Sequence, residues 1–421
     1  MNNSFKRIIE KANFCASCVT KPCQVGCPLN NDITAFIQAI KKQEYHQAFE
    51  ILTDTTLLPA ICGRVCPHEK QCQGACVKRI FYDSVSIGEL EAFIGDMALK
   101  ENWKIPKYTN HKKVEKVAIV GGGPAGLTCA GFLARHGISV TIFEKHEYLG
   151  GILRHGIPEF RLDKQLLDQA IQAILDLGVH VKLGKELGED YTLLDLEKEY
   201  DAIFLGIGAN ISTQMGIPGE ELDGVYGGNE LLENNLHPDY HGKTVVVDGG
   251  GNVAMDVSRT IKRLGASRVI VIYRRSKDEM PAEEKEIKEA MDEGIEFLFQ
   301  TNIVKVLGAS HVEKIECTKN ELVKKADDER LSPVEIPNSK FLMDVSYVVM
   351  AVGSKAEDRV VAGLGLDLSP RGKILISREG KTSNPKVFAG GDVAGVKGTV
   401  AWASRSGRNA SYAILEYLEQ K

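Results

Sequence analysis

The sequence has no long apolar run. No stretch approaches the roughly eighteen apolar residues that a membrane-spanning helix needs. The N-terminal segment MNNSFKRIIEKANFC also lacks the apolar core of an export signal. The formal net charge of −5 does not indicate a nucleic acid or an anionic membrane as a partner. These absences predict a cytoplasmic protein that binds neither membrane nor nucleic acid.

The ten histidines show no spacing typical of a metal site, whereas the ten cysteines are strongly clustered. Eight of them lie between Cys15 and Cys76. In a chain without an export signal, clustered cysteines indicate metal ligands before disulfides. The other two, Cys129 and Cys317, stand alone, and we interpret Cys129 as a packing residue and Cys317 as incidental.

The chain is long enough for two or three domains, with 421 residues, 43% of them hydrophobic and 26% charged. Near the N-terminus, one apolar helix face is predicted by Ile33, Phe36, Ile37 and Ile40. Buried strands followed by glycines are predicted twice, at 117–120 and at 244–247. Further apolar strands, within 201–209 and 344–354, would return to the two sheets. The fold class is therefore α/β with two Rossmann-like βαβ units after a helical segment.

The first glycine turn, GGGPAG, follows the strand 117–120 and precedes an Ala/Leu-rich helix. Gly121 permits the tight turn, Gly123 lets a pyrophosphate approach the backbone, and Gly126 lets the helix pack on the strand. Glu144 ends the next strand at the distance expected for a carboxylate that binds a ribose hydroxyl. The segment predicts a dinucleotide site, with an empty glycine turn as the alternative.

The second turn repeats the pattern at Gly249 and Gly251, with alanine in the third position. The strand that follows ends in Arg274 and Arg275 rather than in an acid, and a guanidinium can pair with a ribose 2′-phosphate. This favours NADPH over NADH. The alternative is a solvated arginine pair. Asp248 does not suit a pyrophosphate loop unless its carboxylate points away.

Two dinucleotide sites in one chain suggest one bound flavin and one exchanging nicotinamide. A flavin takes up hydride directly, so we nominate no catalytic side chain. The cysteine runs Cys15-x2-Cys18-x4-Cys23-x3-Cys27-Pro and Cys62-x3-Cys66-x5-Cys72-x3-Cys76 resemble ferredoxin spacing. Two zinc ions could use the same ligands, and a redox disulfide between Cys15 and Cys18 is a further alternative. A flavin supplies single electrons, which iron–sulfur clusters can carry and zinc cannot.

The motifs together resemble the small (beta) subunit family of NADPH-dependent glutamate synthase, which is shared with the N-terminal half of dihydropyrimidine dehydrogenase. The resemblance rests on CASCVTKPCQVGCP, ICGRVCPHEKQCQGACV, VSIGELEAFI, VAIVGGGPAGL, GGILRHGIPEFRL, DGGGNVAMDVSRT, YRRSKDEMPA and VFAGGDVAG. It implies a helical domain with two 4Fe-4S clusters at 1–110. It also implies interleaved domains, an FAD-binding domain at 111–235 plus 355–421 and an NADPH-binding domain at 236–354.

The resemblance also implies ligands and cofactor contacts. One cluster would use Cys15, Cys18, Cys23 and Cys76, and the other Cys27, Cys66, Cys72 and Glu91, although spacing alone would choose Cys62 over Glu91. The implied FAD contacts are Gly121, Gly123, Pro124, Ala125, Gly126, Glu144, Lys145, Gly151, Leu153, Arg161, Gly391, Asp392 and Thr399. The implied NADPH contacts are Gly249, Gly251, Asn252, Val253, Arg274 and Arg275.

The sequence shows no glutamine-hydrolysing nucleophile motif and no barrel for pyrimidine reduction. We therefore expect an electron-input subunit that takes electrons from NADPH through FAD and two 4Fe-4S clusters to a partner. The large subunit of glutamate synthase is the leading partner. Alternatives are the input subunit of a dihydropyrimidine dehydrogenase or of a sulfide or ferredoxin:NADP+ oxidoreductase. A zinc-bound scaffold without enzyme activity is the non-enzyme alternative.

Overall fold

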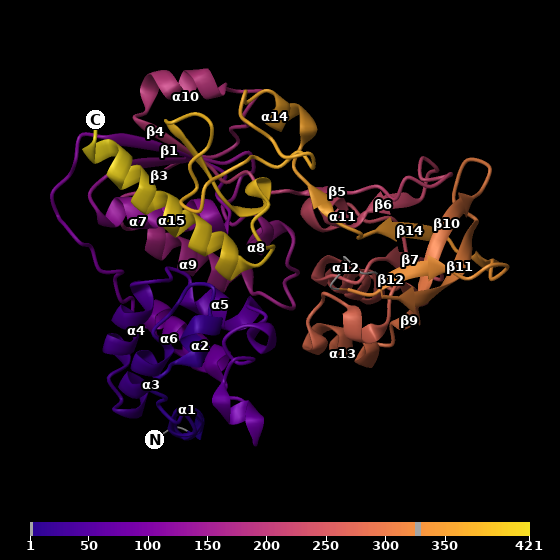
Figure 1. The fold of residues 1–421 in the computed structure, drawn as a ribbon, viewed down its shortest axis with the longest axis horizontal. Helices are drawn as coiled ribbons and strands as arrows, with labels where there is room; N and C mark the ends of the chain where they lie inside the picture. Colours follow the sequence, from indigo (N-terminus) through magenta and orange to yellow (C-terminus); the bar gives the residue numbers. More distant parts are fainter. Residues whose placement is uncertain (1–2, 325–329) are drawn as a thin grey trace. The chain divides into compact units, whose positions relative to one another are not determined.

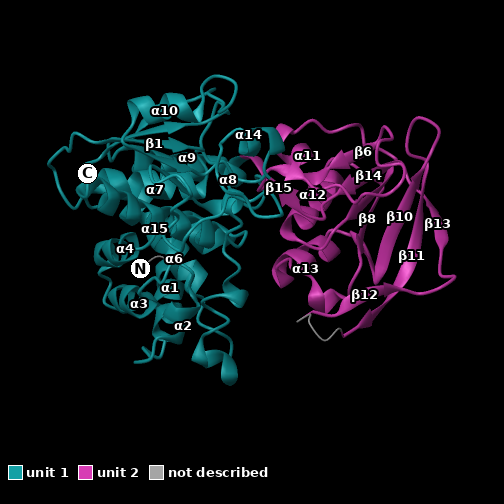
Figure 2. Ribbon diagram, turned by 45° about the horizontal axis from the view of Figure 1, so that its top comes forward, with its two compact units in different colours: residues 1–154, 159–209, 356–421 teal, residues 155–158, 210–355 magenta. Residues whose placement is uncertain are grey.

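The computed structural model describes residues 3–324 and 330–421 and divides into two compact units (Figure 2). Unit 1 comprises Met1–Arg154, Glu159–Ala209 and Ala356–Lys421, and unit 2 comprises His155–Pro158 and Asn210–Lys355. The chain thus leaves unit 1 and returns to it. In the described part of the chain, no helix has both the length and the apolar character that crossing a bilayer would require.

The N-terminal part of unit 1 is helical (Figure 1). Its elements are α1 (Asn3–Asn13), α2 (Pro22–Gly26), α3 (Ile33–Lys41), α4 (Tyr45–Thr53), α5 (Pro59–Val65), η1 (His68–Lys70), η2 (Val77–Ile80) and α6 (Ile87–Lys100). The predicted apolar face is confirmed, because all four of its residues on α3 are buried. Helices α5 and α6 approach closely at glycines: a Cβ on Gly95 would lie 2.3 Å from the Ala60 nitrogen. This contact positions the segments that carry Cys66 and Glu91.

The rest of unit 1 is built on a parallel sheet with the order β16-β4-β1-β2-β3. Its strands are β1 (Lys116–Val120), β2 (Ser139–Phe143), β3 (His180–Lys182), β4 (Ala202–Leu205) and β16 (Val387–Ala389). Its helices are α7 (Pro124–Arg135), α8 (Ile152–His155), α9 (Lys164–Leu175), α10 (Leu193–Glu199), α14 (Asp358–Ala362), η4 (Gly391–Ala394) and α15 (Val400–Glu419). The predicted first strand and its returning strand are confirmed as β1 and β4.

Unit 2 repeats this plan with the parallel sheet β6-β14-β7-β8-β9. Its strands are β6 (Val225–Gly227), β7 (Thr244–Asp248), β8 (Arg268–Tyr273), β9 (Glu296–Phe299) and β14 (Tyr347–Met350). Its helices are α11 (Gly228–Asn234), α12 (Asn252–Arg263), η3 (Lys277–Glu279) and α13 (Glu284–Asp292). The predicted strands at 244–247 and within 344–354 are confirmed as β7 and β14.

Unit 2 also contains antiparallel strands that we did not predict. They form a sheet of β10 (Thr301–Leu307), β11 (Lys314–Val323), β12 (Ser332–Glu335) and β13 (Phe341–Asp344), and a pair of β5 (Ile211–Ser212) and β15 (Ser354–Lys355). The long segment of unit 2 begins at Asn210, whereas the family resemblance implied a boundary between 235 and 236. The physical reason is that β6 pairs with β14 and adds an edge strand to the second sheet.

Candidate functional site

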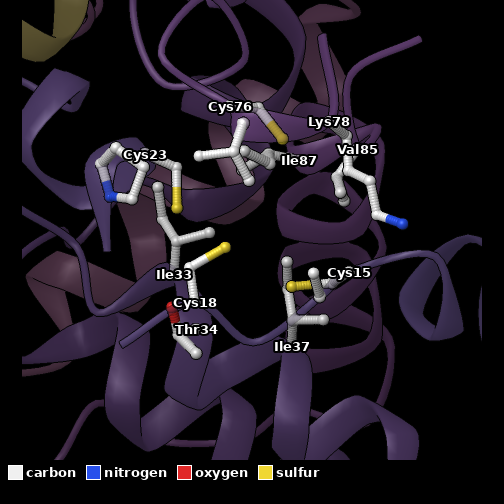
Figure 3. Close-up of a pocket in the computed structure, with 13 residues that line it drawn as sticks. Cys15, Cys18, Cys23, Ile33, Thr34, Ile37, Cys76, Lys78, Val85 and Ile87 are labelled. Atoms are coloured by element: carbon white, nitrogen blue, oxygen red, sulfur yellow. The ribbon is translucent and has the colours of Figure 1, made fainter. Parts of the chain in front are cut away.

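The first cysteine group lines a single pocket in the helical part of unit 1. Cys15 and Cys18 lie between α1 and α2, Cys23 lies on α2, and Cys76 precedes η2. Figure 3 shows the four sulfur atoms around one space, with Ile33, Ile37, Val85 and Ile87 among the apolar lining residues. The structure therefore brings together the four ligands predicted for the first cluster.

The second group consists of Cys27 at the end of α2, Cys66 at the end of α5, Cys72, and Glu91 on α6. Burial raises the pKa of the Cys27 thiol to about 11, and the neighbouring Glu91 carboxylate adds to this rise. The pKa of Cys72 is also raised, first by burial and then by Cys27 and Glu91. Besides a hydrogen bond with Cys62 and burial, Glu91 and Cys72 also raise the pKa of Cys66. Each of these four side chains thus lies within electrostatic range of Glu91 and Cys72.

Glu91 is almost fully buried, with 5% of its surface exposed. Burial raises the pKa of its carboxyl well above the usual range, and Cys62 acts in the same direction. Its Oε1 accepts a hydrogen bond of 3.3 Å from Asn31 Nδ2. A carboxylate buried among thiols is costly unless a cation neutralises it. A metal cluster bound by these groups would provide that positive charge.

Cys62 lies in the same buried region as the second group. A hydrogen bond with Cys66 is the main cause that lowers the pKa of the Cys62 thiol, and burial opposes it. The sulfur also lies 3.8 Å from Thr56 Oγ1. The structure therefore brings both Glu91 and Cys62 to this group, and the choice of Glu91 as a ligand stays a prediction. In residues 3–324 and 330–421, no three His, Cys, Asp or Glu side chains are close enough to share one metal ion.

The first glycine turn joins β1 to α7 and has little space beside its backbone. A Cβ on Gly126 would lie 1.9 Å from the Gly121 oxygen, so only glycine fits there. Glu144, at the end of β2, is buried, and its Oε2 accepts a hydrogen bond of 2.7 Å from the Gly122 nitrogen. Its Oε1 accepts one of 3.0 Å from the His146 nitrogen. The carboxylate is thereby fixed beside the turn.

Two other segments of unit 1 reach this turn. A Cβ on Gly151 would lie 2.8 Å from the Gly123 Cα, and one on Gly391 would lie 3.3 Å from the Ala125 Cβ. The turn 390–395 leads to α15, whose N-cap Thr399 accepts a hydrogen bond from Trp402. Of the other predicted contacts, Leu153 is buried, Arg161 and Asp392 are partly buried, and Lys145 is exposed.

The second glycine turn, in unit 2, joins β7 to α12. The backbone is open at Gly251, where a Cβ would meet nothing within 4 Å. Asn252 begins α12, and its Oδ1 accepts a hydrogen bond of 3.1 Å from the Glu283 nitrogen. Asp248, just before the turn, has a pKa raised to about 7 by burial, with Arg274 opposing and Glu220 adding to the rise.

The two arginines after β8 have different surroundings. Arg274 is exposed. Arg275 is buried, and its Nε donates a hydrogen bond of 2.8 Å to the Leu331 oxygen. The structure therefore separates a pair that the sequence treated as equivalent. Arg274 is the side chain with the greater freedom to meet a nucleotide phosphate.

Comparisons with known proteins agree with this geometry. The family described as pyridine nucleotide-disulphide oxidoreductase matches residues 115–413, and the one described as dihydropyrimidine dehydrogenase domain II, 4Fe-4S cluster, matches residues 2–103. The NADPH glutamate synthase small chain of Halomonas elongata is 36% identical over 428 residues, which cover 97% of this chain and 90% of that protein. The chain belongs to the glutamate synthase small-chain family of pyridine nucleotide-disulphide oxidoreductases.

Other proteins that resemble this chain have different names. The NADP+-dependent formate dehydrogenase subunit beta of Moorella thermoacetica is 36% identical over 432 residues, which cover 96% of this chain and 60% of that protein. The structure of Mycobacterium tuberculosis FprA in complex with NADPH has a TM-score of 0.66 and 18% identity, covering 73% of this chain and 85% of that one. This second likeness shows the shared fold.

Membership of the glutamate synthase small-chain family makes the protein an NADPH-dependent oxidoreductase with FAD and 4Fe-4S cofactors. The residues fit these groups. The first glycine turn is narrow and has a fixed carboxylate, the second is open at Gly251, and the buried thiols gather in two sets. Which residue binds which cofactor stays a prediction.

Some neighbours of the family motifs were not found from the sequence. Lys373 lies close enough to Asp392 to lower its pKa, against the larger rise caused by burial. Ser406 on α15 accepts a hydrogen bond of 2.9 Å from the Gly391 nitrogen. The Tyr273 ring covers Gly250, where a Cβ would lie 2.5 Å from it. No short sequence pattern indicates these contacts, because each of them joins two segments that are separated along the chain.

Proposed function

We propose that the chain is an electron-input subunit of glutamate synthase. In this proposal NADPH binds at the second glycine turn, FAD binds at the first, and two 4Fe-4S clusters bind at the two cysteine groups. When bound, FAD supplies the conversion of a hydride into single electrons, and the clusters supply one-electron transfer. The acceptor is a large subunit that makes glutamate from glutamine and 2-oxoglutarate.

The observation that carries this proposal is the placement of three sites in one unit. Unit 1 contains the first glycine turn and both cysteine groups. Similarity to the Halomonas small chain over nearly the whole of both proteins supports the choice of partner.

We further propose that the acceptor docks beside the first cysteine group. Phe81 and Tyr82, which follow η2 and Cys76, are exposed by 82% and 66%. The Lys78 ammonium lies 4.7 Å from the centre of the Phe14 ring, close to Cys15. Aromatic side chains are enriched at protein–protein contact surfaces, and exposed apolar patches mark such surfaces.

An assay with a partner tests both proposals. The protein is mixed with a purified large subunit of a glutamate synthase, and NADPH-dependent glutamate formation is measured beside NADPH-to-dye reduction. We expect Phe81→Glu to lower glutamate formation and to leave dye reduction unchanged. Leu194→Glu, at an exposed apolar residue of α10, is the matched control. Equal effects of both variants would argue against the docking surface, and no glutamate formation by the wild type would argue against the partner.

A second candidate function is supported by the formate dehydrogenase beta relative. The chain would then exchange electrons with the catalytic subunit of another NADP-dependent complex, as it also would in a dihydropyrimidine dehydrogenase or a sulfide or ferredoxin:NADP+ oxidoreductase. Activity with such a subunit, in the absence of activity with the glutamate synthase large subunit, would favour this candidate.

A further inference from the structure

Arginines of the glycine-turn part of unit 1 bind backbone carbonyls close to the second cysteine group. Arg408 Nη1 on α15 donates hydrogen bonds to the oxygens of Leu29 and Thr55, at 2.9 and 2.7 Å. Arg405 Nη1, one turn earlier, donates to the Pro28 oxygen at 3.1 Å. Pro28 and Leu29 directly follow Cys27. Helix α15 therefore holds the segment that carries a predicted cluster ligand.

Hydrogen bonds continue from Arg408 to the carboxylate of Glu91. Thr55, whose carbonyl accepts from Arg408, donates from its hydroxyl to Asn31 Oδ1 at 2.6 Å. Asn31 Nδ2 then donates to Glu91 Oε1 at 3.3 Å. Asn31 is 1% exposed and Glu91 is 5% exposed, so the part of this connection next to the carboxylate is shielded from water. A buried and fully connected polar network fixes the orientation of its members.

Arg408 is a buried cation without an acidic partner. It is 9% exposed, and within residues 3–324 and 330–421 no ion pair joins it to a carboxylate. Burial lowers the pKa of its guanidinium, and the neighbouring Arg405 adds to this effect, whereas Tyr412 and, to a smaller extent, Cys27 act in the opposite direction. A buried charge is costly unless a counter-charge lies nearby. Three thiolates and a carboxylate around a cluster would form an anionic group that provides this counter-charge.

We propose that Arg408 is a positioning residue and the counter-charge of the second cluster, and this inference rests on the proposed function. Its hydrogen bonds hold the segment after Cys27 and, through Thr55 and Asn31, the carboxylate of Glu91. Its positive charge favours the reduced, more negative form of the cluster, so it raises the reduction potential. Net charge and hydrogen bonding are among the factors that set cluster potentials.

The test compares Arg408→Gln and Arg408→Lys with the wild type, using the full FAD-loaded chain prepared without oxygen. Redox titrations followed by electron paramagnetic resonance give the midpoint potential of each cluster. Hydrogen exchange of the amides of residues 28–31 reports on the segment. We expect Arg408→Gln to lower the potential of one cluster, with the other cluster and the flavin unchanged, and to speed exchange at 28–31. Arg408→Lys should restore most of the potential but not the slow exchange.

Arg405→Gln is the matched control, because Arg405 binds the same segment but is less buried. It should speed exchange and shift the potential less than Arg408→Gln. Unchanged potentials and exchange in Arg408→Gln would overturn the inference, and so would equal shifts of both clusters and the flavin. If Arg408→Gln loses the second cluster altogether, Arg408→Lys decides. A cluster potential close to that of the wild type in Arg408→Lys supports the inference. Loss of the second cluster in Arg408→Lys, with hydrogen exchange at residues 28–31 as slow as in the wild type, overturns it. A wild-type protein without clusters would instead overturn the proposed function.

Discussion

At the scale of single residues, the two arginines at the end of β8 divide their roles. We expect Arg274→Ala to lower kcat/KM for NADPH, because a charge-assisted bond to the 2′-phosphate is lost. The fold-change should correspond to a free energy of about 1–3 kcal/mol. The value for NADH should change little. Dye reduction with the two cofactors measures both. A fall of the same size with NADH would contradict the assignment.

Arg275→Ala is the control for this prediction. Its hydrogen bond to the Leu331 oxygen is a structural contact within unit 2. Loss of that bond should lower the free energy of unfolding by about 1 kcal/mol and should not change the preference between NADPH and NADH. Urea unfolding gives the first quantity, and the dye assay gives the second.

We expect Asp248 to make the free energy of unfolding depend on pH. Burial is the chief cause that raises its pKa to about 7. In the unfolded chain, the pKa of an aspartate is about 4. Below pH ~4 the carboxyl is protonated in both the folded and the unfolded state. Between pH ~4 and pH ~7 only the unfolded state loses the proton, so the free energy of unfolding falls as the pH rises to the folded pKa. The loss is up to about 4 kcal/mol, at roughly 1.4 kcal/mol for each pH unit of the shift.

Asp248→Asn should remove this dependence. The variant should be more stable than the wild type at pH 8 and similar at pH 4, because its neutral amide avoids the cost of burying a charge at this position. Urea unfolding of the protein without nucleotide, at both pH values, measures the difference. If the difference in unfolding free energy between the wild type and Asp248→Asn is the same at pH 4 and pH 8, the raised pKa is contradicted.

At the scale of elements, the packing of α15 on α7 shapes the first glycine turn. A Cβ on Gly407 would lie 2.0 Å from the Ala125 oxygen, so the two helices could not keep their contact. We expect Gly407→Ala to cost about 1–3 kcal/mol of unfolding free energy and to lower FAD content. Gly363→Ala is the control, since its Cβ would lie 3.4 Å from the nearest atom. Equal FAD content in the two variants would refute this role of the contact.

The strands that consist of a short β-branched run followed by glycines were predictable from the sequence. Val117–Val120 and Thr244–Val247 carry that pattern, and β1 and β7 begin and end within one residue of it. Strand β6 was missed because Val225–Gly227 has only three residues and gains its stability from pairing with β14. The contacts of Arg408 with Leu29 and Thr55 join distant segments, so no local pattern could predict them.

The candidate site was predictable to the extent that its motifs are local. Spacing grouped the cysteines, but it favoured Cys62 where the family resemblance implies Glu91, and both lie in the buried group. The split between Arg274 and Arg275 depends on the carbonyl of Leu331, on a segment that the pattern around β8 does not include.

At the scale of the whole molecule, the chain places a helical cysteine domain and a dinucleotide-binding domain in one unit. The contacts of Arg135, Arg405 and Arg408 with carbonyls of residues 28–55 join the two domains. These hydrogen bonds connect the part of unit 1 that carries the cysteine groups with the part that carries the first glycine turn.

Metal analysis of anaerobically purified protein tests the central claim, that one chain joins a flavin to two iron–sulfur clusters. Two 4Fe-4S clusters predict about eight iron atoms and about eight acid-labile sulfides for each FAD. Roughly two zinc ions per chain with no labile sulfide would contradict the account and support a scaffold with structural metal instead.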